Sequence, residues 1–172
     1  MIGLKRGIVK ITPHQKQWET AFETEKKNLL KALGNRVVDI QHIGSTSVPG
    51  LPAKPIIDIS IGLRRFKDAR KLLKPMEKAG YGFYKKFQQQ ILFAKGPDSR
   101  RTHYVHVMRY RGAKWTTDML FRDYLRTHPR RVKAYAMLKL RLAKQFANDR
   151  GKYSDGKNRF IKETLQLSKR KL

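Results

Sequence analysis

The chain has 172 residues, 40% of them hydrophobic, and carries 40 Lys and Arg against 13 Asp and Glu, a formal net charge of +27. This length and apolar content fit one globular unit with a substantial core and exclude a disordered basic tail. The absence of cysteine excludes disulfides, thiolate metal sites and cysteine nucleophiles. The charge favours polyanionic partners, either nucleic acid or nucleotide phosphates, although a merely solvated basic surface has the same composition.

The sequence shows neither targeting signals nor domain boundaries. Its first stretch, MIGLKRGIVKITP, has no apolar run of signal-peptide length, and no run of about eighteen apolar residues is present to span a membrane. We therefore expect a cytoplasmic protein without membrane contacts. No repeat or Gly/Ser-rich linker occurs, so we expect one domain over 1–172, with an α/β front to about residue 112 and a helical back from about 113.

The front half is predicted to begin with an amphipathic helix that starts at Thr12 and Pro13 and ends at Gly34. Its apolar residues recur at helical spacing: Trp18, Phe22, Leu29 and Leu33. Two strands are expected next, over 36–44 and 54–63, because both segments are rich in β-branched residues. Proline and glycine keep the link between these strands from being helical.

The later elements are predicted to complete a sheet and then a helical part. A basic helix over 66–79 precedes a hairpin or meander over 81–87 and 89–96, and a further strand follows over 101–110. Three helices come last, over 115–128, 134–148 and 154–167, with Ser154 as the N-cap of the final one. The expected fold is α+β or α/β, with about five strands, flanking helices and a C-terminal helical part.

The turn after the first predicted strand is a candidate phosphate site. Glycine lets the backbone approach an anion closely, and the amides and hydroxyls that follow Gly44 can donate to phosphate oxygens: those of Ser45, Thr46 and Ser47. Gly-Ser pairs make ordinary turns far more often than phosphate sites. The G-x-x-x-x-G-K-[ST] spacing of a P-loop is absent.

Asp58 stands out because it interrupts an apolar run, Ile56 to Ile61. A carboxylate there needs a metal ion, a cation or hydrogen-bond donors to offset its lost hydration. On a strand, Asp58 and Ser60 share one face and the isoleucines take the other, so the acid pointing to solvent is the alternative.

A third candidate element is the strand RTHYVHV. Alternation places Tyr104 and His106 on one face and His103 on the other, so the two imidazoles are not expected to chelate one ion. A single strand histidine is more often a hydrogen-bonded structural residue than a ligand. The residues themselves indicate a phosphate or metal site and no more.

Taken together, these segments resemble the GrpB family of the nucleotidyltransferase superfamily. The resemblance is carried by QHIGSTSVPGLPAKPIIDISIG, by RTHYVHVM followed by WTTDMLFRDYLRTHP, and by YAMLKLRLAKQFANDRGKYSDGKNRFIKETL, and it spans roughly Thr12 to Leu165. It implies a nucleotidyltransferase-like fold with a mixed sheet. It also implies that a hydroxyl attacks the α-phosphate of a nucleoside triphosphate, with a divalent metal, Mg²⁺ or Mn²⁺, shielding the charge.

The resemblance assigns roles to particular residues. Gly44 and Ser45 match the Gly-Ser turn that holds the phosphates, and Asp58 matches the first metal-binding acid. The usual second acid is replaced, since the motif reads Asp58-Ile59-Ser60, which leaves one carboxylate. The position of a third acid offers His106, so Asp58, Ser45 and His106 are the candidate catalytic residues, with a His42/Asp58/His106 metal cluster as the hypothesis.

Four cations are candidate contacts for an anionic substrate: Lys54, Arg101, Arg122 and Lys157. In a chain this basic, most cations are simply solvated, so each candidate carries that alternative. The leading function is a metal-dependent nucleotidyltransferase that uses a nucleoside triphosphate to modify a small-molecule acceptor. The alternatives are a nucleotide- or phosphometabolite-binding module without activity, and a protein that binds RNA or modifies RNA ends through its basic surface.

Overall fold

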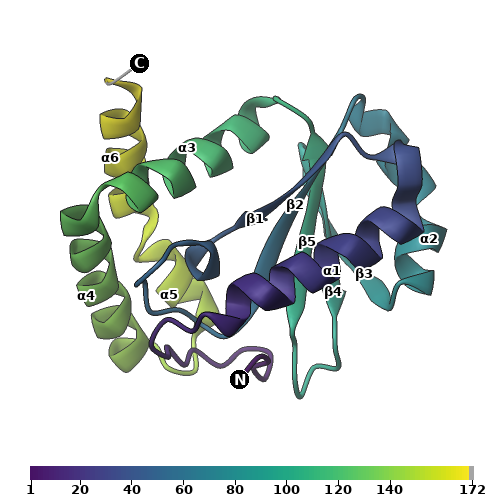
Figure 1. The fold of residues 1–172 in the computed structure, drawn as a ribbon. Helices are drawn as coiled ribbons and strands as arrows, with labels where there is room; N and C mark the ends of the chain where they lie inside the picture. Colours follow the sequence, from purple (N-terminus) through teal and green to yellow (C-terminus); the bar gives the residue numbers. More distant parts are fainter. Residues whose placement is uncertain (171–172) are drawn as a thin grey trace.

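Five strands form one mixed sheet in the order β1-β2-β5-β4-β3 in the computed structural model, which describes residues 1–170 (Figure 1). The strands are β1 (Asp39–Ile43), β2 (Ile57–Leu63), β3 (Tyr81–Lys86), β4 (Gln90–Lys95) and β5 (His103–Arg109). Strands β2 and β5 are parallel, and every other neighbouring pair is antiparallel. The predicted five-stranded α+β architecture is confirmed, and β3 and β4 form the expected hairpin.

The helices lie on the sheet and beside it (Figure 1). They are α1 (Gln17–Leu33), α2 (Leu73–Lys78), α3 (Ala113–Thr127), α4 (Pro129–Gln145), α5 (Arg150–Asp155) and α6 (Asn158–Lys169). Helices α1 and α2 cover one face, whereas α3 to α6 form the helical part beside the sheet edge that β1 forms. No helix within residues 1–170 is long and apolar enough to cross a lipid bilayer.

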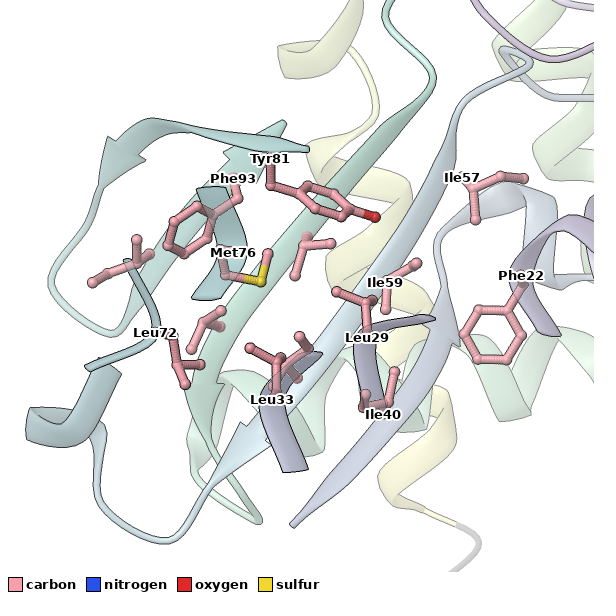
Figure 2. Close-up of a cluster of buried hydrophobic side chains, with 14 of the residues drawn as sticks. Phe22, Leu29, Leu33, Ile40, Ile57, Ile59, Leu72, Met76, Tyr81 and Phe93 are labelled. Atoms are coloured by element: carbon pink, nitrogen blue, oxygen red, sulfur yellow. The ribbon is translucent and has the colours of Figure 1, made fainter. Parts of the chain in front are cut away.

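The main core lies between α1, α2 and one face of the sheet (Figure 2). Leu29 and Leu33 of α1 are fully buried against Ile59, whose strand alternates apolar and polar side chains. Burying one such aliphatic side chain contributes about 1.5–3 kcal/mol. The isoleucines of β2 are thereby committed to this core, and Asp58 and Ser60 face the opposite side of the sheet, as the alternation predicts.

Two predicted helix starts are wrong. Thr12 does not cap the first helix, because its N–H and C=O pair with the backbone of Ala53, and α1 begins later, at Gln17. Ser154 does not cap the last helix, because it lies inside the short α5, where the Asp149 side chain accepts the Lys152 N–H and acts as the N-cap. The predicted final helix is therefore two helices, α5 and α6.

Two further helix boundaries differ. The segment predicted as one helix over 66–79 is a 3₁₀ segment, Phe66–Leu72, continued by α2. Helix α4 starts at Pro129, five residues before the expected start at 134, because proline suits the first turn of a helix, where its missing N–H is not needed.

A buried ion pair locks α1 to the hairpin. The Glu25 carboxylate, 6% exposed, accepts hydrogen bonds from the Tyr81 hydroxyl and the Lys95 ammonium, both at 2.8 Å. Burial raises the pKa of Glu25, but the bonds from Lys95 and Tyr81 outweigh it and leave the pKa below its usual value. The ionised carboxylate therefore stabilises the fold at neutral pH.

Glu25→Gln is expected to lower the free energy of unfolding by about 1–3 kcal/mol at neutral pH, because Lys95 loses its charged partner. The pKa of Glu25 is lower in the folded protein than in the unfolded chain, where it is 4.5. The carboxylate therefore contributes its full stabilisation above pH 4.5, and this stabilisation is lost as the pH falls through the folded pKa. Urea unfolding at neutral and acidic pH should show the wild-type advantage shrinking in acid. An advantage that grows in acid would contradict this assignment.

Candidate functional site

The Gly-Ser turn lies directly against Asp58. Gly44 follows β1 with a φ of 69°, and a Cβ placed on it would lie 2.8 Å from Asp58 Oδ2. The Ser47 hydroxyl donates to the Gly44 carbonyl at 2.6 Å, which fixes the turn Ser45–Ser47. Neither the Ser45 nor the Thr46 N–H donates to a backbone carbonyl within residues 1–170. The predicted meeting of turn and acid is therefore present in the structure.

Asp58 is held by a histidine on the neighbouring strand. Its Oδ1 lies 3.3 Å from His106 Nε2, and His106 Nδ1 lies 3.2 Å from Gln90 Oε1. Burial raises the pKa of Asp58, but the hydrogen bond with His106 and the nearby positive charges outweigh it, so the pKa lies below its usual value. The carboxylate is ionised at neutral pH and 33% exposed.

A cavity of about 270 Å³ opens beside this acid and the turn. Its far wall is made by α4, α5 and α6, so the two halves of the chain meet at it. Four cationic side chains line it, which we call the cationic pocket: Lys54, Lys139, Arg150 and Lys157. None of the four forms an ion pair with a carboxylate of residues 1–170.

Two of these lysines share one aromatic ring. The ammonium groups of Lys54 and Lys157 lie 5.4 and 4.5 Å from the centre of the Tyr153 ring. Burial lowers the pKa of both lysines to about 8, and the charge of Arg150 adds to the effect. Near neutral pH these ammonium groups are still mainly protonated, but they are held close to losing their charge.

The other two pocket cations, Arg150 and Lys139, also lie against tyrosine rings. The Arg150 guanidinium donates to the Tyr104 hydroxyl at 2.9 Å and lies 5.0 Å from the ring centre. Lys139, 2% exposed, donates to the Pro52 carbonyl and lies 5.2 Å from the centre of the Tyr135 ring. Burial places the pKa of Lys139 well below the usual lysine value. The pocket thus concentrates positive charge with little negative charge to balance it.

The predicted site residues divide into two groups. Those that the structure brings together at the pocket are Gly44, Ser45, Thr46, Lys54, Asp58 and Lys157, with His106 bound to Asp58 from behind. Ser47 lies beside the pocket, and its hydroxyl is used within the turn.

The hypothesis of a His42/Asp58/His106 metal cluster is wrong. His42 pairs with Ile59, so its side chain lies on the α1 face of the sheet, opposite the face of Asp58. Its ring stacks on Phe22 at 4.7 Å, and its Nε2 is 2.9 Å from the Thr46 hydroxyl. Burial lowers the pKa of His42 to about 4, so the ring is neutral and supports the turn from beneath.

Arg101 and Arg122 do not line the pocket either. Arg101 pairs with Asp98 in the β4–β5 loop and donates to the Gly96 carbonyl. Arg122 is buried and donates to Gln41 Oε1 at 2.8 Å and to the His42 carbonyl at 3.0 Å. Both guanidinium groups join segments of the fold, so the structure does not support an anion-binding role at this site.

Sequence reasoning missed several residues of the pocket: Tyr104, Tyr135, Lys139, Arg150 and Tyr153. The four-residue spacing of Tyr135 and Lys139 puts both on one helix face, which is a weak signal that a lysine belongs to the interior. No local motif distinguishes Lys139 or Arg150 from the many solvated cations of the chain.

The donor set does not fit the two-ion site that the family resemblance implies. Asp58 supplies one carboxylate, and Ser60, in the position of the second, is 0% exposed with a hydroxyl that has no hydrogen-bond partner. No group of three or more His, Cys, Asp or Glu side chains suited to a metal ion occurs in the described part of the chain. Hard divalent cations take six or more oxygen ligands, and the pocket offers mainly cations instead.

Comparisons with known proteins agree with the fold and the motifs. The family model described as GrpB protein matches residues 8–167. The chain is 37% identical to the glutamate-rich protein GrpB of Alkalihalophilus pseudofirmus, over 96% of this chain and 98% of that protein. A crystal structure of the conserved protein GrpB from Enterococcus faecalis is 32% identical, covers 94% of this chain and 98% of its own, and superposes with a TM-score of 0.86.

A more distant similarity concerns the fold alone. A cytoplasmic RNA terminal U-transferase superposes with a TM-score of 0.51 at 14% identity, over 83% of this chain and 42% of that chain. The fold is thus similar to that of this transferase, and the near full-length matches establish that the chain belongs to the GrpB family.

Proposed function

We propose that the protein is a nucleotidyltransferase that binds a nucleoside triphosphate in the cationic pocket and transfers its nucleotidyl group to a small-molecule hydroxyl. The observation that carries the proposal is the contact of Gly44 with Asp58, since the missing side chain lets the turn pack directly on the acid while the cavity opens beside both. The pocket cations, Lys54, Arg150 and Lys157, supply the charge that attracts polyphosphate.

The chemistry follows from these positions. The acceptor oxygen forms a bond to the α-phosphorus while the bond from that phosphorus to its bridging oxygen breaks, so pyrophosphate leaves. Asp58, ionised and held by His106, takes the proton of the attacking hydroxyl. The N–H groups of Ser45 and Thr46 donate to phosphate oxygens, and the lysines stabilise the charge that develops on the leaving pyrophosphate.

The direct test is pyrophosphate release. The protein is incubated with each of the four nucleoside triphosphates and a panel of small hydroxyl compounds, in EDTA and with Mg²⁺ or Mn²⁺. We expect release that depends on both the nucleotide and one acceptor class. Tight nucleotide binding with no release under any condition would contradict transfer and favour a binding module.

Binding without turnover is the second candidate, and Ser60 favours it. The family resemblance implies a second acid at the position where this chain has the buried hydroxyl of Ser60. If the protein only senses or sequesters a nucleotide, the affinity is retained while pyrophosphate stays at background.

RNA is the third candidate partner, favoured by the formal charge of +27. When a protein binds the phosphate backbone, the logarithm of its binding constant falls linearly with the logarithm of the salt concentration. Such binding does not depend on a single carboxylate. Short RNA is therefore included among the acceptors. Affinity for RNA that falls steeply with salt, with no nucleotide-dependent product, would indicate binding outside the pocket.

A further inference from the structure

The charge of the cationic pocket is uncompensated in the free protein. Lys54, Lys139, Arg150 and Lys157 surround a cavity that also contains one carboxylate, Asp58. That carboxylate already has a partner, since its Oδ1 is bound to His106. The four cations and the single acid leave an excess of up to three positive charges in a small volume.

Such an arrangement is unfavourable unless a ligand completes it. Like charges held together under partial burial repel one another, and the tyrosine rings and the Pro52 carbonyl replace only part of the hydration that the ammonium groups lose. The pKa values of Lys54 and Lys157 are lowered mainly by burial, and the nearby charge of Arg150 lowers them further. A polyanion in the cavity would convert each repulsive pair into two attractive contacts.

The tyrosines of the pocket hold the cations in place and leave them able to bind phosphate. Tyr153 is shared by Lys54 and Lys157, and Tyr104 holds Arg150 by its hydroxyl. Aromatic rings stabilise cations without supplying a negative charge, so the ammonium groups keep their capacity to bind phosphate. A carboxylate in the same position would have neutralised them.

We infer that the pocket binds a polyphosphate through its own cations and needs no divalent metal ion to do so. This inference rests on the proposed function and concerns how the donor nucleotide is held. Side-chain cations line the pocket beside Asp58, and the second acid that the family resemblance implies is replaced by the buried Ser60. The excess charge fits a di- or triphosphate better than a monophosphate.

The test is calorimetric titration of the protein with inorganic triphosphate and with ATP, in EDTA and then in excess Mg²⁺. We expect binding in EDTA with a dissociation constant within about threefold of the Mg²⁺ value, and weaker binding of inorganic phosphate. Lys54→Met and Lys157→Met should each weaken binding about tenfold, as the loss of one charge-assisted contact predicts. Lys144→Met, an exposed lysine of α4 outside the pocket, is the matched control and should change little.

The possible outcomes distinguish metal-free binding of polyphosphate from nucleotide binding in general. If ATP binds with Mg²⁺ but not in EDTA, metal-free binding is overturned and nucleotide binding stands. If ATP binds in neither buffer, both are overturned. If Lys144→Met weakens binding as much as Lys157→Met, the affinity comes from general surface charge. Melting temperatures of all variants confirm that each one is folded.

The affinity should also depend on pH. Lys54 faces Arg150, Lys157 and Asp58, and Lys139 approaches the same lysines from α4. With pKa values of about 8 in the free protein, Lys54 and Lys157 lose protons as the pH rises through that value, and a polyphosphate must then restore them. Triphosphate affinity is expected to fall between about pH 7.5 and 9.5, with proton uptake on binding. If the triphosphate affinity of the wild-type protein, like that of Lys54→Met and Lys157→Met, did not change over this pH range, the two lysines would not be the groups that titrate on binding.

Discussion

Gly44→Ala is expected to weaken nucleotide binding about a hundredfold, because the new methyl group would lie 2.8 Å from Asp58 Oδ2. Gly44 also has a φ of 69° and a ψ of −171°, a combination essentially restricted to glycine, so alanine there costs about 1–3 kcal/mol. The turn therefore has to move away from the acid, which displaces Ser45 and Thr46 from the wall of the cavity. Calorimetric titration with inorganic triphosphate measures the effect.

Gly50→Ala is the matched control for this substitution. Gly50 lies in the same connection with a φ of 75°, yet a Cβ placed on it meets nothing within 4 Å. Gly44→Ala should lose more stability in thermal unfolding than Gly50→Ala, because only its methyl group meets another side chain, and only Gly44→Ala should lose binding. Equal losses of binding would mean that loop strain, not the contact with Asp58, governs the affinity.

Asp58→Asn is expected to reduce pyrophosphate release about 10²- to 10⁴-fold, the usual contribution of a general base. The amide has nearly the same shape but cannot take a proton, so the acceptor hydroxyl stays unactivated. Binding of triphosphate should be retained or strengthened, because the one negative charge of the pocket is removed. Initial rates and calorimetry on the same preparation separate the two effects.

The control for Asp58→Asn is Asp155→Asn, which removes an exposed carboxylate of α5 close in sequence to the pocket residue Ser154. This variant should keep wild-type rates. If Asp58→Asn instead abolishes binding and leaves no measurable complex, the carboxylate holds the ligand and its assignment as proton acceptor is wrong.

Local pattern was enough to predict the strands and the face on which Asp58 lies. The alternation of isoleucines with Asp58 and Ser60 has a period of two, and burial of the isoleucines leaves no other orientation for the acid. The glycine at 44 likewise indicated a turn in which the backbone approaches a neighbour. The family resemblance then associated this turn with phosphate.

What the sequence could not supply is the pairing of distant segments. The contact of Asp58 with His106 depends on β5 lying beside β2 in a parallel register that matches Ser60 with His106. His42 was grouped with them because it is close in sequence, but the antiparallel register with β2 turns it to the other face. Register is set by tertiary packing and cannot be read from one strand.

The helical wall of the pocket was equally hidden. Lys139 and Arg150 belong to the pocket only because α4 and α5 pack near the turn. There, the ammonium and guanidinium groups lie against tyrosine rings. In the sequence they are two among 40 basic residues. The capping of α5 by Asp149 in place of Ser154 has the same origin, since it depends on where the chain leaves α4.

The position of β2 between β1 and β5 has a consequence for how the chain acquires its shape. Strand β2, which bears Asp58, can pair with β1 early in folding. Its other edge pairs with β5, which follows the β3–β4 hairpin in the chain. Contacts between such remote stretches make folding slow, because a large loop has to close first. A shortened polypeptide that stops before residue 103 would therefore contain Gly44 and Asp58 but lack both His106 and the helical wall of the pocket, so it should not retain the ligand.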